Sequence, residues 1–140
     1  MALSVLCAAV FLGHITRPRR RPRSTPMGYY HSTYFAYGLH IPLDAHPWTE
    51  TDRIDTALAT VKDQCPEVGH LTAGDYDRDR LFLVTKSDEI ALGKYGRVMP
   101  STPEQRADWD RQLRTAVDHL GYGHLRDLAE PTWLCIPDLS

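Results

Sequence analysis

The sequence predicts a single α+β domain over residues 27–140, with its elements in the order β-α-β-β-α-β. Two segments repeat apolar residues at three- and four-residue spacing, as amphipathic helices do. Four shorter runs of aromatic, β-branched or apolar residues are bounded by prolines or polar turns, as strands are. With 42% hydrophobic and 24% charged residues in a chain of 140, the composition is that of an ordinary globular protein.

The first strand is expected at Tyr29–Ile41, because aromatic and β-branched side chains suit a pleated surface. Its odd-numbered residues are the more apolar set, so that face should meet the core. The first helix is expected at Thr49–Gln64, where one stripe of the helix is apolar. Thr49 with Asp52 resembles a capping pair, and Pro66 should stop the helix.

The middle of the domain should contain two more strands. Val68–Ala73 is a short strand candidate, and Gly74–Asp79 is a polar turn. Arg80–Thr85 is a nearly continuous apolar run, as expected of a central strand. Lys86–Pro100 is ambiguous between a short strand and an ordered excursion loop.

The second helix has the clearest boundaries in the chain. Thr102 can cap it, Pro103 suits the first helical position, and Gly121 stands where a C-terminal cap belongs. Thr132–Ile136 is the last expected strand, closed by Pro137.

The simplest packing of these elements is a four-stranded antiparallel sheet with both helices on one face. This is the ferredoxin-like βαββαβ arrangement, with strand order 4-1-3-2. It places the first and third strands in the centre, and these are the two most apolar runs.

Residues 1–26 differ from the rest of the chain. Ala2–Gly13 is almost wholly apolar but would span only about 18 Å as a helix, against about 30 Å for a bilayer core, so no membrane span is expected. The positive charge follows the apolar run, whereas a secretory signal has it before. We expect a flexible Arg-rich arm, or a chain whose true start is Met27.

Charge is distributed unevenly. Removing the five arginines of Arg17–Arg23 from the net charge of −2 leaves −7 for the body. Because nucleic-acid affinity depends on basic groups that release counterions, binding by the body is disfavoured. Weak non-specific contact with nucleic acid through Arg17–Arg23 stays open.

The three cysteines, Cys7, Cys65 and Cys135, are far apart and show no zinc spacing. They indicate a reduced, cytoplasmic protein with buried thiols. The many Arg and Asp and few Lys are typical of a high-GC bacterium or its phage.

One pattern has a catalytic mechanism: H-x-T occurs as His31-Ser32-Thr33 and as His70-Leu71-Thr72. On a strand, residues two apart share a face, so imidazole and hydroxyl lie side by side. Two facing pairs could hold a phosphodiester, one His acting as base and one as acid while Thr33 and Thr72 bind phosphate oxygens. The paired motif resembles that of the two-histidine phosphoesterases. The resemblance implies attack of a ribose 2′-hydroxyl on the adjacent phosphate without a metal.

Other features favour a different interpretation of these histidines. In the expected sheet the third strand separates the two motifs by about 10 Å. His31 and Thr33 also share the apolar face, where a hydrogen-bonded core histidine is the simpler expectation. A metal-free phosphodiesterase is therefore the alternative function.

No metal or cofactor site is expected. The acidic turn after Gly74 has Arg80 and Lys86 where a calcium loop needs glycine and glutamate. His40, Asp44 and His46 match no chelating spacing. No Walker, dinucleotide-binding or other cofactor motif is present.

The expected binding residues lie on two features. Tyr30 and Tyr34 belong to the even-numbered, open face of the sheet, which should be covered by the excursion loop or by a protein partner. Lys86, Lys94 and Arg97 make that excursion the only basic part of the body. We therefore expect a small soluble binding or regulatory module of bacterial or phage type that acts by protein–protein contact.

Overall fold

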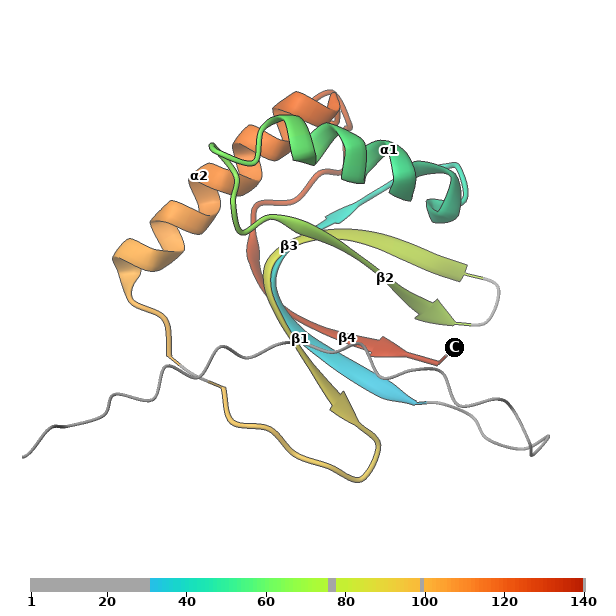
Figure 1. Cartoon of the computed structure of the whole chain (residues 1–140). Helices are drawn as coiled ribbons and strands as arrows, with labels where there is room; N and C mark the ends of the chain where they lie inside the picture. Colours follow the sequence, from blue (N-terminus) through green and yellow to red (C-terminus); the bar gives the residue numbers. More distant parts are fainter. Residues whose placement is uncertain (1–30, 76–77, 99, 140) are drawn as a thin grey trace, which may run out of the picture.

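The computed structural model describes residues 31–75, 78–98 and 100–139. Its elements are β1 (Ser32–Ile41), α1 (Pro47–Thr60), β2 (Gly69–Asp75), β3 (Arg78–Ala91), α2 (Pro103–Leu120) and β4 (Thr132–Asp138). The antiparallel strands form one sheet in the order β2-β3-β1-β4, and both helices cover the same face (Figure 1). The predicted ferredoxin-like fold is confirmed, with β1 and β3 in the centre. Residues 1–26 lie outside the described residues.

The two helices differ in how well the sequence predicts their ends. The cap of α2 is confirmed: the Thr102 hydroxyl accepts a hydrogen bond from the Gln105 amide at 3.1 Å, and Gly121 is left-handed with φ 78°. The capping pair expected for α1 is wrong. That helix begins at Pro47, and the Thr49 hydroxyl instead donates to the His46 carbonyl at 2.8 Å. It ends at Thr60, whereas the sequence predicted an end at Gln64; the backbone leaves the helical conformation at Val61, before Pro66 is reached.

The strands are longer than predicted where a partner strand extends them. β3 continues through the ambiguous segment to Ala91, because Lys86–Ala91 pairs with the first half of β1. β4 continues through Pro137 to Asp138. It is an edge strand, so a proline that lacks an amide proton is tolerated there.

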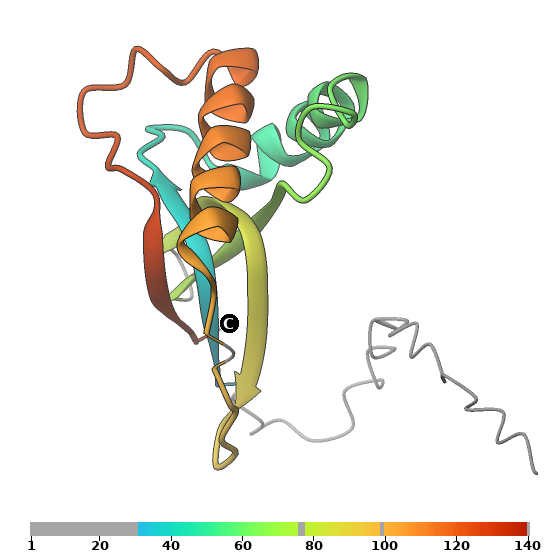
Figure 2. The same ribbon diagram turned by 90° about the vertical axis from the view of Figure 1, so that its left-hand side faces the viewer.

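The main core lies between the helices and the odd-numbered face of β1, as predicted. Leu39 and Ile41 from β1 are at most 3% exposed, and they belong to one cluster with Ile54 of α1 and Leu113 of α2. Figure 2 shows α2 lying along this face of the sheet. The buried Gln112 side chain is hydrogen-bonded to the Glu67 backbone amide and to two carboxylates, so its amide group is buried with its polar atoms paired.

The opposite face of the sheet is buried as well, although no described helix covers it. Ala36, Ala73, Phe82, Val84 and Ile136 form a second core cluster, each at most 6% exposed. The sheet curls around this cluster until its two edges meet, as the ends of β2 and β4 show (Figure 1).

Two hydrogen bonds join those edges. The Leu139 amide donates to the Gly74 carbonyl at 2.8 Å, and the Gly74 amide donates to an Asp138 carboxylate oxygen at 3.3 Å. The expectation of an open face covered by the excursion loop or by a partner is therefore wrong. The curvature of the sheet itself covers the apolar residues of that face.

A bulge at Gly38 permits the curl. The β1–β3 register shifts between Tyr37 and Gly38, which leaves Thr85 of β3 without an opposite residue. Bulges of this kind bend a strand and increase its twist. A Cβ atom on Gly38 would lie only 1.9 Å from the Leu83 carbonyl oxygen, so no other residue fits without moving the backbone.

Gly38→Ala should therefore destabilise the domain by about 1–3 kcal/mol, the usual cost of overpacking. Gly69→Ala is the matched control, because a Cβ at Gly69 meets nothing within 4 Å. It should change the free energy of unfolding by no more than about 0.5 kcal/mol. Urea denaturation of both variants measures the difference, and equal stability of the two would contradict the role of Gly38.

Candidate functional site

The structure does not bring the two H-x-T pairs together. His31 immediately precedes β1, and Thr33 lies opposite Ile90. His70 of β2 pairs with Leu83 of β3, and Leu83 pairs in turn with Leu39 of β1. Leu39 is eight residues further along the chain than His31. That offset corresponds to roughly 26 Å of strand. Both pairs lie on the convex face of the curled sheet, so their side chains diverge and cannot contact one phosphate.

His70 and Thr72 make contacts that belong to the packing of the fold. The Nε2 atom of His70 lies 2.8 Å from an Asp55 carboxylate oxygen of α1, and its Nδ1 atom is buried without a hydrogen-bond partner. Thr72 lies opposite the buried Leu81. Among residues 31–75, 78–98 and 100–139, no group of three or more His, Cys, Asp or Glu side chains could hold a metal ion.

The tyrosines expected to bind have different positions. Tyr30 lies outside the described residues. Tyr34 is half-buried on the concave face beside the second core cluster. Its burial, and then the charges of Glu89 and Asp138, raise the pKa of its phenol. Tyr34 therefore contributes to packing within the curled sheet.

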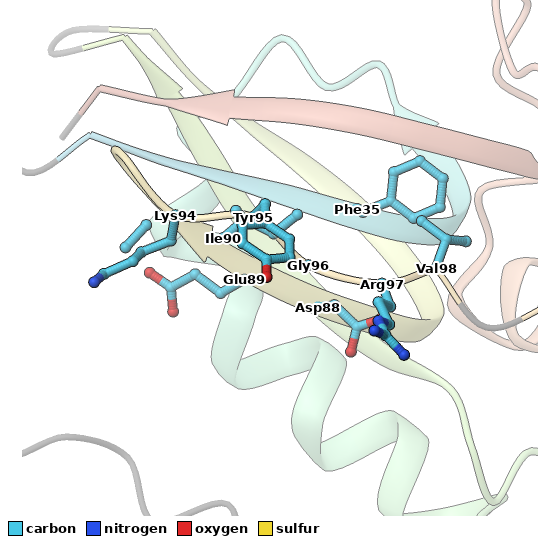
Figure 3. Close-up of a pocket in the computed structure, with 10 residues that line it drawn as sticks. Phe35, Asp88, Glu89, Ile90, Lys94, Tyr95, Gly96, Arg97 and Val98 are labelled. Atoms are coloured by element: carbon cyan, nitrogen blue, oxygen red, sulfur yellow. The ribbon is translucent and has the colours of Figure 1, made fainter.

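The three predicted basic residues separate into two places. Lys86 is half-buried in β3, opposite Tyr37 of β1. Lys94 and Arg97 are exposed in the segment that follows β3, and both line a groove of about 370 Å³. In Figure 3 their side chains extend from the loop that crosses in front of β1 and β3.

We call residues 92–98 the 92–98 loop. Among the described residues, it contains most of the large hydrophobic side chains that are exposed: Leu92 is 75% exposed, Tyr95 90% and Val98 52%. Phe35 of β1 and Ile90 of β3 form the apolar floor of the groove, and Asp88 and Glu89 line its side (Figure 3). The loop and groove together combine apolar contact area with charges of both signs.

The loop is held against the sheet at its first residues. The Leu92 amide donates to the His31 carbonyl at 3.0 Å, and the Lys94 amide donates to the Ala91 carbonyl at the same distance. Gly93 has φ 76°, which a side chain would disfavour. Gly96 packs against Ile90, whose side chain lies 3.4 Å from the position of a Cβ atom there. These contacts fix the loop so that its exposed side chains are presented outward.

Aromatic rings connect the groove to the main core. Phe35 stacks on Trp133 of β4 with centroids 5.1 Å apart, and Trp133 meets Tyr37 edge-on at 5.2 Å. Trp109 of α2 contacts both Tyr37 and Trp133. The Tyr37 hydroxyl donates to an Asp110 carboxylate oxygen at 2.6 Å. The floor of the groove is therefore connected by ring contacts to the main core cluster.

Sequence reasoning identified the cations of this site but missed its apolar residues. Leu92, Tyr95 and Val98 recur every third position between glycines and cations, in a segment with no helical or strand pattern. Large apolar residues at regular spacing in a polar loop were the sequence signal that could have identified this exposed apolar surface. Phe35 gave no such signal, because its position on a strand face is typical of a core residue.

Comparisons with protein-family models, with curated proteins and with solved structures find no match to this chain. None of the helices in the described part of the chain is long and apolar enough to span a membrane. The thiols of Cys65 and Cys135 are free, but only Cys65 is buried, so the expectation of buried thiols fails for Cys135.

The aromatic anchor predicts a pH dependence. Burial and the hydrogen bond to Asp110 raise the pKa of Tyr37 to about 12. Because an unfolded tyrosine ionises near pH 10, the stabilisation is complete below about pH 10 and is lost as the pH rises towards about 12. Phenolate absorbance against pH should show one late-titrating tyrosine fewer in Tyr37→Phe than in the native chain. Loss of a phenol that titrates near pH 10 instead would contradict the anchor.

Proposed function

We propose that this protein is a binding module that contacts a protein partner through the 92–98 loop and its groove. One observation carries the proposal: three of the four large hydrophobic side chains that are exposed in the described part of the chain occur in this loop. Apolar side chains gathered on a surface mark interaction sites, whereas singly scattered ones do not. The fourth, Trp48, is 63% exposed and stands alone at the start of α1.

The residue types of the loop favour a protein as the partner. Tyr and Arg are enriched among the residues that dominate binding energy at protein interfaces, and Tyr95 and Arg97 are both exposed here. Because the first residues of the loop are held by backbone hydrogen bonds, less conformational entropy is lost there on binding. The complementary surface would present an apolar patch flanked by carboxylates, which Lys94 and Arg97 would pair with.

Nucleic acid is a poorer fit for this surface. Asp88 and Glu89 line the same groove as Lys94 and Arg97, so a phosphate backbone would meet like charge beside each cation. The phosphodiesterase hypothesis lacks support for a different reason, since its two H-x-T pairs lie on diverging parts of the sheet. We place the module in the cytoplasm, where free thiols such as Cys65 and Cys135 stay reduced.

The test compares the native chain with Tyr95→Ala and Arg97→Ala, using Trp48→Ala as the control for an exposed aromatic residue elsewhere. Each purified chain is immobilised, exposed to nuclease-treated lysate of the native host, and the retained proteins are quantified. We expect one protein to be retained by the native chain and by Trp48→Ala but lost from the two loop variants.

The binding of that protein is then measured in purified form. Tyr95→Ala should weaken it by about 2 kcal/mol, roughly a 30-fold increase in Kd, as for a residue at the centre of an interface. Retention that depends on intact nucleic acid, or that Trp48→Ala reduces as much as Tyr95→Ala does, would contradict the proposal.

A further inference from the structure

A second hollow lies at the other end of β1, away from the 92–98 loop. β4 begins at Thr132, opposite Gly38, so the last three residues of β1 have no strand beside them on that side. The connection from α2 to β4 and the one from β1 to α1 both line this gap. Together with the start of β3 they border an open hollow of about 450 Å³. That volume lies within the range of small-molecule binding sites, which often occupy the mouths of curled or closed sheets.

The hollow is lined by charges of both signs that do not pair with each other. Arg80 comes from β3, Arg126 and Asp127 from the α2–β4 connection, and Asp44 from the β1–α1 connection. Within the described residues, none of these four side chains forms an ion pair or side-chain hydrogen bond. Charges that converge on one hollow without neutralising each other are suited to a ligand that bridges them.

His40 lies at the inner wall of this hollow. Its ring contacts Phe82 of the second core cluster at a centroid distance of 5.3 Å. Burial, and then the nearby charge of Arg80, lower the pKa of His40 below its usual value. An anion bound beside the ring would favour its protonated form and so raise this pKa.

The chemistry of the lining selects the ligand class. Two guanidinium groups can each make paired hydrogen bonds to phosphate oxygens, which a lysine cannot do in the same planar geometry. Carboxylates accept hydrogen bonds from hydroxyl groups. Pro42, Leu43 and Leu125 supply an apolar wall for a compact carbon skeleton. A metal ion is a poorer fit, because the described residues contain no cluster of three or more ligands.

We propose that this hollow binds a small phosphate monoester that carries hydroxyl groups, of sugar-phosphate size. Arg80 and Arg126 hold the phosphate, and Asp44 and Asp127 accept hydrogen bonds from the hydroxyls. The site is independent of the 92–98 loop, so Tyr95→Ala leaves ligand binding unchanged whether or not the loop binds a protein.

The test is calorimetric titration of the full chain with ribose 5-phosphate, inorganic phosphate and ribose at physiological salt. We expect ribose 5-phosphate to bind and ribose not to bind. The double variant Arg80→Gln/Arg126→Gln should raise the Kd for ribose 5-phosphate at least about 100-fold, since it removes the charge-assisted hydrogen bonds of both guanidinium groups to the phosphate. Arg106→Gln is the matched control, because Arg106 is exposed on α2 and, within the described residues, has no ion pair.

Two further measurements make the outcome decisive. The His40 imidazole signals in NMR spectra should show a pKa that rises when ribose 5-phosphate is bound, and unchanged backbone spectra of the double variant would show that it still folds. Asp44→Ala/Asp127→Ala, which removes both hydroxyl acceptors, should remove the preference for ribose 5-phosphate over inorganic phosphate. Absence of binding to the native chain, or equal weakening by Arg106→Gln, would overturn the proposal.

Discussion

The close approach of Gly38 to the Leu83 carbonyl is the constraint on which the rest of this structure depends. It allows the two long central strands to bend at a bulge, and the bend brings the edges of β2 and β4 together. A flat sheet with two helices would bury one face only. By curling, this sheet buries apolar residues on both faces, so a domain of modest size obtains two core clusters.

The same bend decides which surfaces remain for function. The helices cover only part of the convex face, because β1 and β3 extend past them (Figure 2). The chain that leaves β3 returns across that remaining part as the 92–98 loop. Its floor, Phe35, is packed on Trp133 and thereby on Tyr37 and the main core. The 92–98 loop therefore lies on a floor that is packed against the main core, and this favours a preformed binding surface.

The two candidate sites lie at opposite ends of β1 and differ in chemistry. The groove beside Phe35 is an apolar surface rimmed by charge, suited to a macromolecule. The hollow beside His40 is a concave site lined by arginines and aspartates, suited to a small polar ligand. His40 of β1 also contacts Phe82 of β3, which belongs to the second core cluster. Both candidate sites are therefore built on the same pair of curved strands, β1 and β3.

The sequence alone determined the element order, the central position of β1 and β3, and the caps of α2, because these follow from local periodicity and from single residues such as Thr102 and Gly121. It also located the basic loop residues Lys94 and Arg97. Only the tertiary structure decided the curl, the separation of His31 from His70, and the position of Arg80 and Arg126 at one hollow. These depend on contacts between residues distant in the chain, for which no local pattern carries information.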